Sequence, residues 1–140
     1  MEVAIRPVTM KDADALFALV ERFATSFKPE HELFEVSLKH FLSDESAWLS
    51  VAEYDGAIIG YCLGFDHYAF YANGRVSWVE EIMVNEELRL KGVGRVLMDA
   101  FEEWAKSRNS KLIGLATRRA APFYTALGYE ESATFFRKLL

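Results

Sequence analysis

EEIMVNEELRLKGVGRVLMDAFEEW, residues 80–104, is the segment around which the rest of the chain is organised. Its first residues, Glu80–Val84, end a run that begins near Arg75 and is rich in Val, Ile and Trp, which predicts a buried strand. From Val93 to Trp104 apolar residues recur with the spacing of one helix face, and charged residues cover the other side, which predicts an amphipathic helix. Between the strand and the helix lies Arg89-Leu90-Lys91-Gly92-Val93-Gly94, in which two glycines open the helix.

The two glycines make this helix start suited to binding phosphate groups. Glycine has no Cβ, so the peptide N–H groups beside it can approach a ligand closely. The first N–H groups of a helix lack internal partners and lie at the positive end of the helix dipole. A strand, a glycine-containing turn and a helix N-terminus together form a phosphate-binding site. The segment lacks the Gly-Lys-Ser/Thr ending of a Walker loop and the third glycine of a dinucleotide fingerprint, which disfavours both of those motifs.

Two segments resemble a known family. Arg89-x-x-Gly92-x-Gly94, after a strand ending in Ile82-Met83-Val84, resembles the acetyl-CoA-binding motif of the GNAT N-acetyltransferases. Residues 123–129, Phe-Tyr-Thr-Ala-Leu-Gly-Tyr, are similar to the family's helix with a tyrosine followed by glycine and an aromatic residue. The resemblance covers nearly the whole chain and implies an acetyl-CoA-dependent N-acetyltransferase.

The resemblance also implies how acetyl-CoA is held. In the family a bulged strand is splayed from its parallel neighbour, so that free backbone groups pair with the pantetheine arm, and one N–H donates to the thioester carbonyl oxygen. The amides that open the helix would bind the pyrophosphate, and Thr117 stands in a segment where many members carry an asparagine that holds pantetheine. The cofactor-binding residues expected on this basis are Ile82, Met83, Val84, Arg89, Leu90, Lys91, Gly92, Val93, Gly94, Arg95, Thr117 and Phe123. For Lys91 and Arg95 the alternative is solvated surface charge, and for Phe123 it is packing in the core.

Three residues are candidates for proton transfer. The resemblance places Tyr124 near the cofactor sulfur. A phenol of pKa about 10 has a proton affinity comparable to that of a departing thiolate, which favours general acid catalysis; the alternative is a core tyrosine.

Glu80 and Glu81 stand together in an apolar run although glutamate is depleted in strands. Because side chains alternate between the two faces of a strand, only one of the two glutamates would point at the site. The match to polyamine-acetylating relatives favours Glu80, with Glu81 next. A carboxylate of ordinary pKa needs burial or a water relay to take the amine proton, and the alternative is an ion-paired or solvated pair. His67 is a further candidate base.

Composition limits the classes of protein that fit. At 140 residues, 51% hydrophobic and 26% charged, the chain is expected to form one globular domain, residues 1–140. No apolar run reaches the ~18–20 residues that span a bilayer, and no basic-then-apolar leader is present. The single cysteine, Cys62, excludes an internal disulfide and fits a reducing compartment, so we expect a cytoplasmic protein. The net charge of −5 disfavours nucleic acid as a partner and favours a small cationic amine as the acceptor. No spacing of His, Cys and Asp suggests a metal.

The remaining segments predict an α/β fold with a mixed sheet that is mostly antiparallel and has helices on both faces. Asp55-Gly56 and Asn73-Gly74 are hairpin signals, and the crossover after the long helix favours a parallel neighbour. The expected strands are Glu2–Arg6, Trp48–Tyr54, Ala57–Phe65, Arg75–Val84, Lys111–Ala116 and Tyr129–Leu139; besides the long helix from Val93, the expected helices are one ending before the Ala24–Glu30 loop, His31–Leu42 and Arg118–Leu127. The last strand could pair across a homodimer. Two other functions stay open: a non-catalytic acyl-CoA-binding sensor or partner-binding domain, and acetylation of protein N-termini or lysines.

Overall fold

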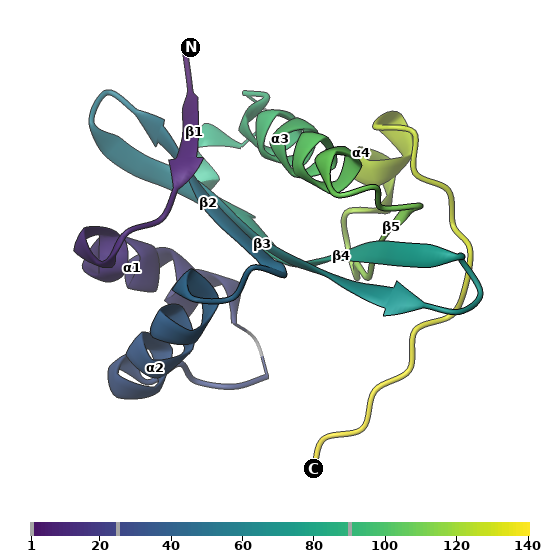
Figure 1. Ribbon diagram of the computed structural model, residues 1–140. Helices are drawn as coiled ribbons and strands as arrows, with labels where there is room; N and C mark the ends of the chain where they lie inside the picture. The colour runs from purple at the N-terminus through teal and green to yellow at the C-terminus, as the bar shows by residue number, and fades with distance from the viewer. Residues whose placement is uncertain (1, 25, 90) are drawn as a thin grey trace.

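The computed structural model describes residues 2–24, 26–89 and 91–140 (Figure 1). Leu90, one of the expected cofactor-binding residues, lies outside the described residues. In chain order the elements are β1 (Ala4–Pro7), the 3₁₀ helix η1 (Met10–Asp12), α1 (Ala13–Phe23), α2 (His31–Leu42), β2 (Ala47–Tyr54), β3 (Ala57–Ala69), β4 (Gly74–Val84), the 3₁₀ helix η2 (Glu86–Leu88), α3 (Val93–Ser107), β5 (Ile113–Leu115) and α4 (Ala121–Ala126).

The sheet is mixed, in the strand order β1-β2-β3-β4-β5. The first four strands pair in antiparallel fashion, and both hairpin signals are confirmed by the backbone: Asp55 and Gly56 have φ of 51° and 76°, and Asn73 has φ of 59°. β4 and β5 are parallel, as the crossover through α3 predicted. This mixed sheet confirms the expected fold class.

Helices cover both faces of the sheet. Figure 1 shows α1 and α2 on one face and α3 on the other, with α4 beside α3. The apolar core is divided in the same way. Val93, Leu97, Met98 and Phe101 of α3 pack with the α3 face of the sheet, whereas the buried residues of α1 and α2 pack with Val51, Tyr61 and Met83 on the opposite face. Alternating side chains along each strand therefore serve two separate clusters.

A buried ion pair joins the far end of α3 to the sheet. Asp66 in β3 is 1% exposed at its side chain and accepts hydrogen bonds from both Nε and Nη2 of Arg108, which follows α3. Arg75 in β4 approaches the same carboxylate at 4.0 Å. The bidentate geometry fixes the end of α3, and hence the line along which its N-terminus points.

The predicted last strand, Tyr129–Leu139, is wrong: no strand follows α4 in the structure, and every residue from 130 to 140 is exposed. β5 is only three residues long and offers little backbone for a further strand to pair with. The tail instead crosses to the side of α1 and α2, where Phe135 stacks on Trp78 at 6.3 Å and Arg137 donates a hydrogen bond to Ser26 (Figure 1).

Other boundaries differ by a few residues. β3 continues to Ala69 and therefore includes His67, which lies beyond the expected strand Ala57–Phe65. β5 and α4 are both shorter than predicted. No helix in the described parts of the chain is long and apolar enough to cross a membrane.

Candidate active site

A β-bulge in β4 lies at the two glutamates. Val79 pairs with Gly64 of β3 and Glu81 pairs with Leu63, so Glu80 is the extra residue that has no partner in the ladder. The bulge shifts the alternation by one residue. As a result Glu81, rather than Glu80, takes the position opposite Leu63, on the sheet face that α1 and α2 cover.

The two glutamates lie in different surroundings. Glu80 is exposed, whereas Glu81 is partly buried and accepts a hydrogen bond of 2.7 Å at Oε1 from the hydroxyl group of Tyr61. Burial raises the pKa of the Glu81 carboxyl above its ordinary value, the hydrogen bond from Tyr61 acts in the opposite direction, and the charge of Glu80 adds to the rise. A carboxylate with a raised pKa is a stronger base than an exposed one.

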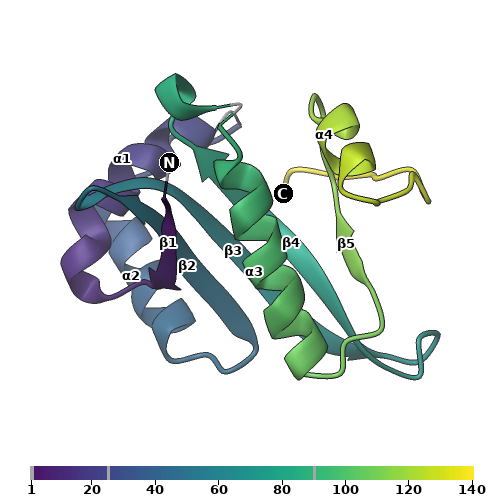
Figure 2. The same ribbon diagram turned by 90° about the horizontal axis from the view of Figure 1, so that it is seen from above.

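The bulge also marks the point where β4 and β5 separate. The parallel pairing runs from Ser77 opposite Ile113 to Val79 opposite Leu115 and then stops. Figure 2 shows the two strands diverging toward the N-terminus of α3. Residues 80–84 are paired with β3 on one side only, so the backbone groups of Ile82, Met83 and Val84 that point toward β5 face an open edge.

Arg89 lies against the end of this edge. Its Nε donates to the carbonyl oxygen of Val84 at 3.3 Å, and Nη2 lies 3.5 Å from the Met83 sulfur. The guanidinium group therefore lies against the last residues of β4, a position of the Arg89 side chain that the motif spacing alone did not specify.

The N-terminus of α3 has the features of a phosphate-binding site. Gly92 is the N-cap with φ of 86°, which is favourable only for glycine, and a Cβ added there would meet no atom of the other described residues beyond its chain neighbours within 4 Å. Among the described residues the first helical hydrogen bond runs from Val96 N–H to Gly92 C=O, so the amides of residues 93–95 precede it, and no described side chain caps the helix. Lys91 and Arg95 are exposed beside these amides.

α4 packs directly on the start of α3. A Cβ at Gly94 would lie 3.1 Å from the ring of Phe123, so the missing side chain is what allows this aromatic residue to approach the helix. Thr117 Oγ1 accepts a hydrogen bond from the backbone N–H of Ala120 and so holds the turn that leads into α4. Its hydroxyl proton remains as a donor.

Tyr124 lies in the α3-side cluster with Val79 and Val93 and is 8% exposed. Burial raises the pKa of its phenol to about 12, with a smaller contribution from Cys62. Among the described residues its hydroxyl group has no hydrogen-bond partner, and it is not fully enclosed. The phenol is therefore available as a donor to a ligand.

The structure brings most of the predicted site residues together at the divergence of β4 and β5. The start of α3, α4 and the open edge of β4 meet there, with Tyr124 on the α3 face and Glu81 on the opposite face (Figure 2). His67 lies in the distal part of β3 opposite Val76 and is exposed. Sequence reasoning missed Tyr61. The available signal was a tyrosine within an apolar strand, because a buried phenol needs a hydrogen-bond partner.

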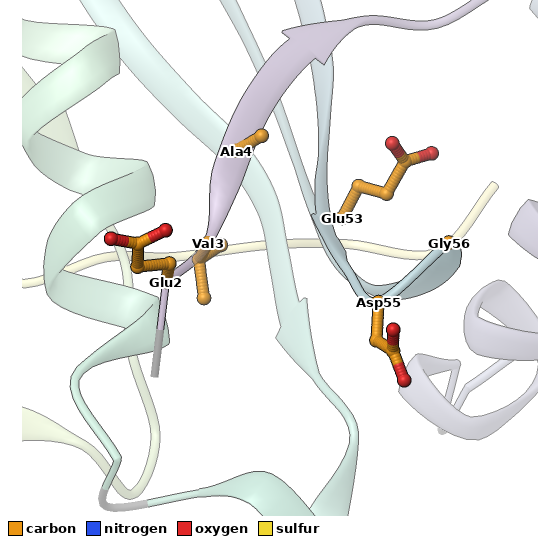
Figure 3. A pocket seen from close by; sticks show the side chains of 6 residues that line it. All are labelled: Glu2, Val3, Ala4, Glu53, Asp55 and Gly56. Atoms are coloured by element: carbon orange, nitrogen blue, oxygen red, sulfur yellow. The ribbon is translucent and has the colours of Figure 1, made fainter.

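Two hollows on the surface lie elsewhere. One of about 460 Å³ is lined by residues of β1 and of the β2–β3 turn, including Glu2, Glu53 and Asp55. Figure 3 shows the Glu2 carboxylate pointing to one side of β1 and those of Glu53 and Asp55 to the other, so the three do not converge. A second hollow, of about 300 Å³, lies at the C-terminal end of α3. Within residues 2–24, 26–89 and 91–140 there is no group of three or more His, Cys, Asp or Glu placed to hold a metal.

Comparison with known proteins agrees with this geometry. The model of the acetyltransferase (GNAT) family matches residues 13–129. An uncharacterized N-acetyltransferase of Bacillus subtilis, YhfO, is 26% identical over 137 residues, which cover 94% of this chain and 92% of that protein. A crystal structure from Bacillus halodurans, described as a transcriptional regulator, superposes with a TM-score of 0.89 at 23% identity over 99% of this chain and 100% of that one.

A third protein with a similar structure is a glucosamine-6-phosphate N-acetyltransferase of Arabidopsis thaliana, with a TM-score of 0.87 and 19% identity over 99% of each chain. At these identities the solved structures show a shared fold, and the family model shows the relationship. The chain therefore belongs to the acetyltransferase (GNAT) family and is an N-acetyltransferase.

Proposed function

We propose that the protein transfers the acetyl group of acetyl-CoA to the primary amine of a small cationic acceptor, by direct attack, with Glu81 as the base and Tyr124 as the acid. Enzymes of this family use acetyl-CoA. The observation that carries the proposal is the partly buried carboxylate of Glu81 beside the open edge of β4, opposite a buried phenol that has no partner among the described residues.

Several groups of this chain would hold acetyl-CoA. The amides of residues 93–95 suit the pyrophosphate because they have no partner among the described residues, lie at the positive end of a fifteen-residue helix and are flanked by Lys91 and Arg95. Ile82, Met83 and Val84 lie along the strand edge that β5 leaves open, and one N–H among them would donate to the thioester oxygen as charge develops there. The carbonyl oxygen of Val84 is already engaged by Arg89. Arg89, Thr117 and Phe123 would complete the binding surface at the ends of this edge.

The proton transfers balance across the sheet. Glu81 takes one proton from the neutral form of the attacking amine, directly or through water, as the nitrogen bonds to the carbonyl carbon, and it releases this proton to solvent before the next cycle. When the carbon–sulfur bond breaks, Tyr124 gives its proton to the sulfur and regains one from solvent. Because burial raises the pKa of Tyr124 to about 12, the phenol is protonated throughout the physiological range and enters each cycle as a donor.

Between the two glutamates, burial and hydrogen bonding favour Glu81 as the base, with Glu80 as the alternative that the sequence placed first. A raised pKa brings a carboxylate closer to the value at which a general base works best near neutral pH. Glu80 is exposed at the bulge and adds a negative charge next to Glu81, where the acceptor amine would bind. Two carboxylates and a net charge of −5 favour a cationic acceptor over an anionic one.

A panel of amines, followed by CoA release, tests the proposal. We expect turnover with small polyamines or diamines and a loss of about 10²–10⁴-fold in kcat for Glu81→Gln. Glu80→Gln is the matched control, because it removes the same charge one residue away, and it should raise KM for a cationic acceptor more than it lowers kcat. Equal activity of wild type and Glu81→Gln would exclude Glu81 as the base.

The same panel separates the other functions. Acetylation of peptide N-termini or lysines alone would make this a protein acetyltransferase. Binding of acetyl-CoA without CoA release on any amine would indicate a sensor domain, a reading to which the description of the Bacillus halodurans protein as a transcriptional regulator gives some support. A homodimer remains part of the proposal, and light scattering at several protein concentrations tests it.

A further inference from the structure

We propose that Tyr61 is a positioning residue for the reaction: its hydroxyl group donates to the Glu81 carboxylate and holds it in one orientation beside the open edge of β4. This inference rests on the proposed function, because Tyr61 would act through the proposed base, Glu81. It adds a residue of β3 to a site otherwise built from β4, α3 and α4.

The position of the Tyr61 hydroxyl group is fixed by packing. Tyr61 is 1% exposed and lies opposite Met83 in the β3–β4 ladder, diagonal to Glu81. Its cluster contains buried residues from α1, α2 and β2, namely Leu16, Leu19, Leu38 and Val51. A ring packed on several sides has one orientation, so its hydroxyl group is a donor at a fixed point.

The hydrogen bond selects one arrangement of a flexible side chain. Glutamate has three rotatable side-chain bonds, and ordering such a side chain has an entropic cost. The 2.7 Å bond from Tyr61 Oη to Glu81 Oε1 fixes one carboxylate oxygen. The second oxygen, Oε2, has no protein donor among the described residues, so it is left to accept the proton of the amine or of a relay water.

The hydrogen bond from Tyr61 also affects the pKa of Glu81. Within the described chain, the titratable groups that act on the Glu81 carboxyl are Tyr61 from β3 and Glu80 from β4 itself, whereas α1 and α2 contribute apolar residues to the cluster around Tyr61. Burial and the Glu80 charge both raise the pKa of Glu81, and only the Tyr61 hydrogen bond lowers it. Burial, followed by the charge of Glu81, raises the pKa of Tyr61 itself far above 10, so this phenol stays a donor.

The balance between these opposing effects on the pKa of Glu81 decides whether the carboxylate can act as a general base. A carboxyl group whose pKa rises without limit would be protonated at neutral pH and could not accept a proton. The Tyr61 bond favours the ionised form and therefore extends the pH range of activity toward acid. Its removal should move the pKa of Glu81 upward, since the two remaining influences both act in that direction.

Tyr61→Phe tests the inference, because it deletes the donor and keeps the ring. We expect the acidic limb of the kcat/KM profile to move upward by about one to two pH units, the size of one hydrogen bond to a charged group. Tyr129→Phe is the matched control. It deletes a hydroxyl group that donates to another carboxylate, Glu102, at 2.9 Å, and it should leave the limb in place.

A direct titration of the Glu81 carboxyl by carbon NMR, assigned with Glu81→Gln, separates this inference from the proposed function. An upward move of both the carboxyl pKa and the acidic limb in Tyr61→Phe supports the inference. A carboxyl that moves while the limb stays means that Glu81 is not the base, and a carboxyl that does not move means that Tyr61 does not favour its ionised form; either result overturns the inference. If no amine is acetylated by the wild type, the proposed function fails, and with it the role assigned to Tyr61.

If Tyr61→Phe does not fold, the wild type supplies the measurement. The proton of a buried hydroxyl group bonded to a carboxylate exchanges slowly, and its resonance should move as Glu81 titrates. A Tyr61 hydroxyl resonance that is insensitive to the Glu81 titration overturns the inference.

Discussion

Tyr124 and Tyr129 offer a paired test of the site, because the same substitution should have opposite consequences at the two positions. Their rings lie 6.0 Å apart. The Tyr124 hydroxyl group has no partner among the described residues, so Tyr124→Phe breaks no hydrogen bond and should change the free energy of unfolding by less than about 0.5 kcal/mol. If the phenol is the acid, the same change should lower kcat by about 10²–10⁴-fold.

Tyr129→Phe should reverse this result. The Tyr129 hydroxyl group donates to Glu102 at 2.9 Å, and a hydrogen bond to a charged acceptor is worth about 1.5–3 kcal/mol when it is buried. Both side chains are partly exposed, so solvent screening reduces this to about 1 kcal/mol, or roughly 3–5 °C in Tm for a chain of this length. Turnover should be unchanged, because this phenol is already engaged by Glu102.

Three measurements decide the matter: CoA release for kcat, calorimetric titration with CoA for affinity, and thermal unfolding for stability. Tyr124→Phe should retain wild-type affinity for CoA. Since burial raises the pKa of Tyr124 to about 12, its deprotonation should produce no descending limb in kcat/KM below about pH 11. A Tyr124→Phe enzyme with more than a tenth of wild-type turnover, or one that loses CoA binding in proportion, would refute the assignment as an acid.

Three further predictions concern the framework. Asp12 forms an ion pair with Arg6 of β1 that lowers the pKa of Asp12 from 3.8 to about 2. Asp12→Asn removes this pair, so urea unfolding should show a free energy of unfolding that is lower by about 2 kcal/mol at neutral pH, and the difference should disappear as the pH falls from 4 to 2. A difference that does not depend on pH would contradict this. Gly64→Ala would place a Cβ against the Phe101 ring and 2.9 Å from the carbonyl oxygen of Trp78, so we expect about 1–3 kcal/mol of destabilisation, and wild-type stability would show that the contact relaxes freely. Deleting residues 131–140 should remove about 0.5–1.5 kcal/mol, the value of the one aromatic stack on Trp78; a larger loss, or a change in molecular mass by light scattering, would mean that the tail is paired in solution.

The sequence predicted the elements that local rules determine. The Asp-Gly and Asn-Gly turns require backbone with positive φ, and both occur where expected. His31–Leu42 is a helix with the predicted bounds, and α3 begins at Val93 as the glycines indicated. These features depend on a few neighbouring residues, so their signals are contained within short windows.

The features that the sequence did not predict depend on pairing between distant segments. The alternation of side chains along a regular strand predicts that Glu80 and Glu81 point to opposite faces of the sheet. The position of the bulge, however, depends on how β4 fits against β3. The contact between Tyr61 and Glu81 spans twenty residues of sequence. The tail has the composition of a strand, yet a strand also needs a neighbour of sufficient length, and β5 has only three residues.

The bulge at Glu80 connects the two halves of the proposed chemistry. From Ser77 to Val79, β4 is paired on both sides, with β3 and with β5; beyond the bulge it is paired with β3 alone. The same inserted residue moves Glu81 into the position opposite Leu63, on the face of Tyr61. One irregularity therefore coincides with the open edge that we propose for acetyl-CoA and places a carboxylate on the opposite face from Tyr124. A thioester in the opening would then meet its acid from one side of the sheet and its amine from the other, which is the geometry that direct attack in a ternary complex requires.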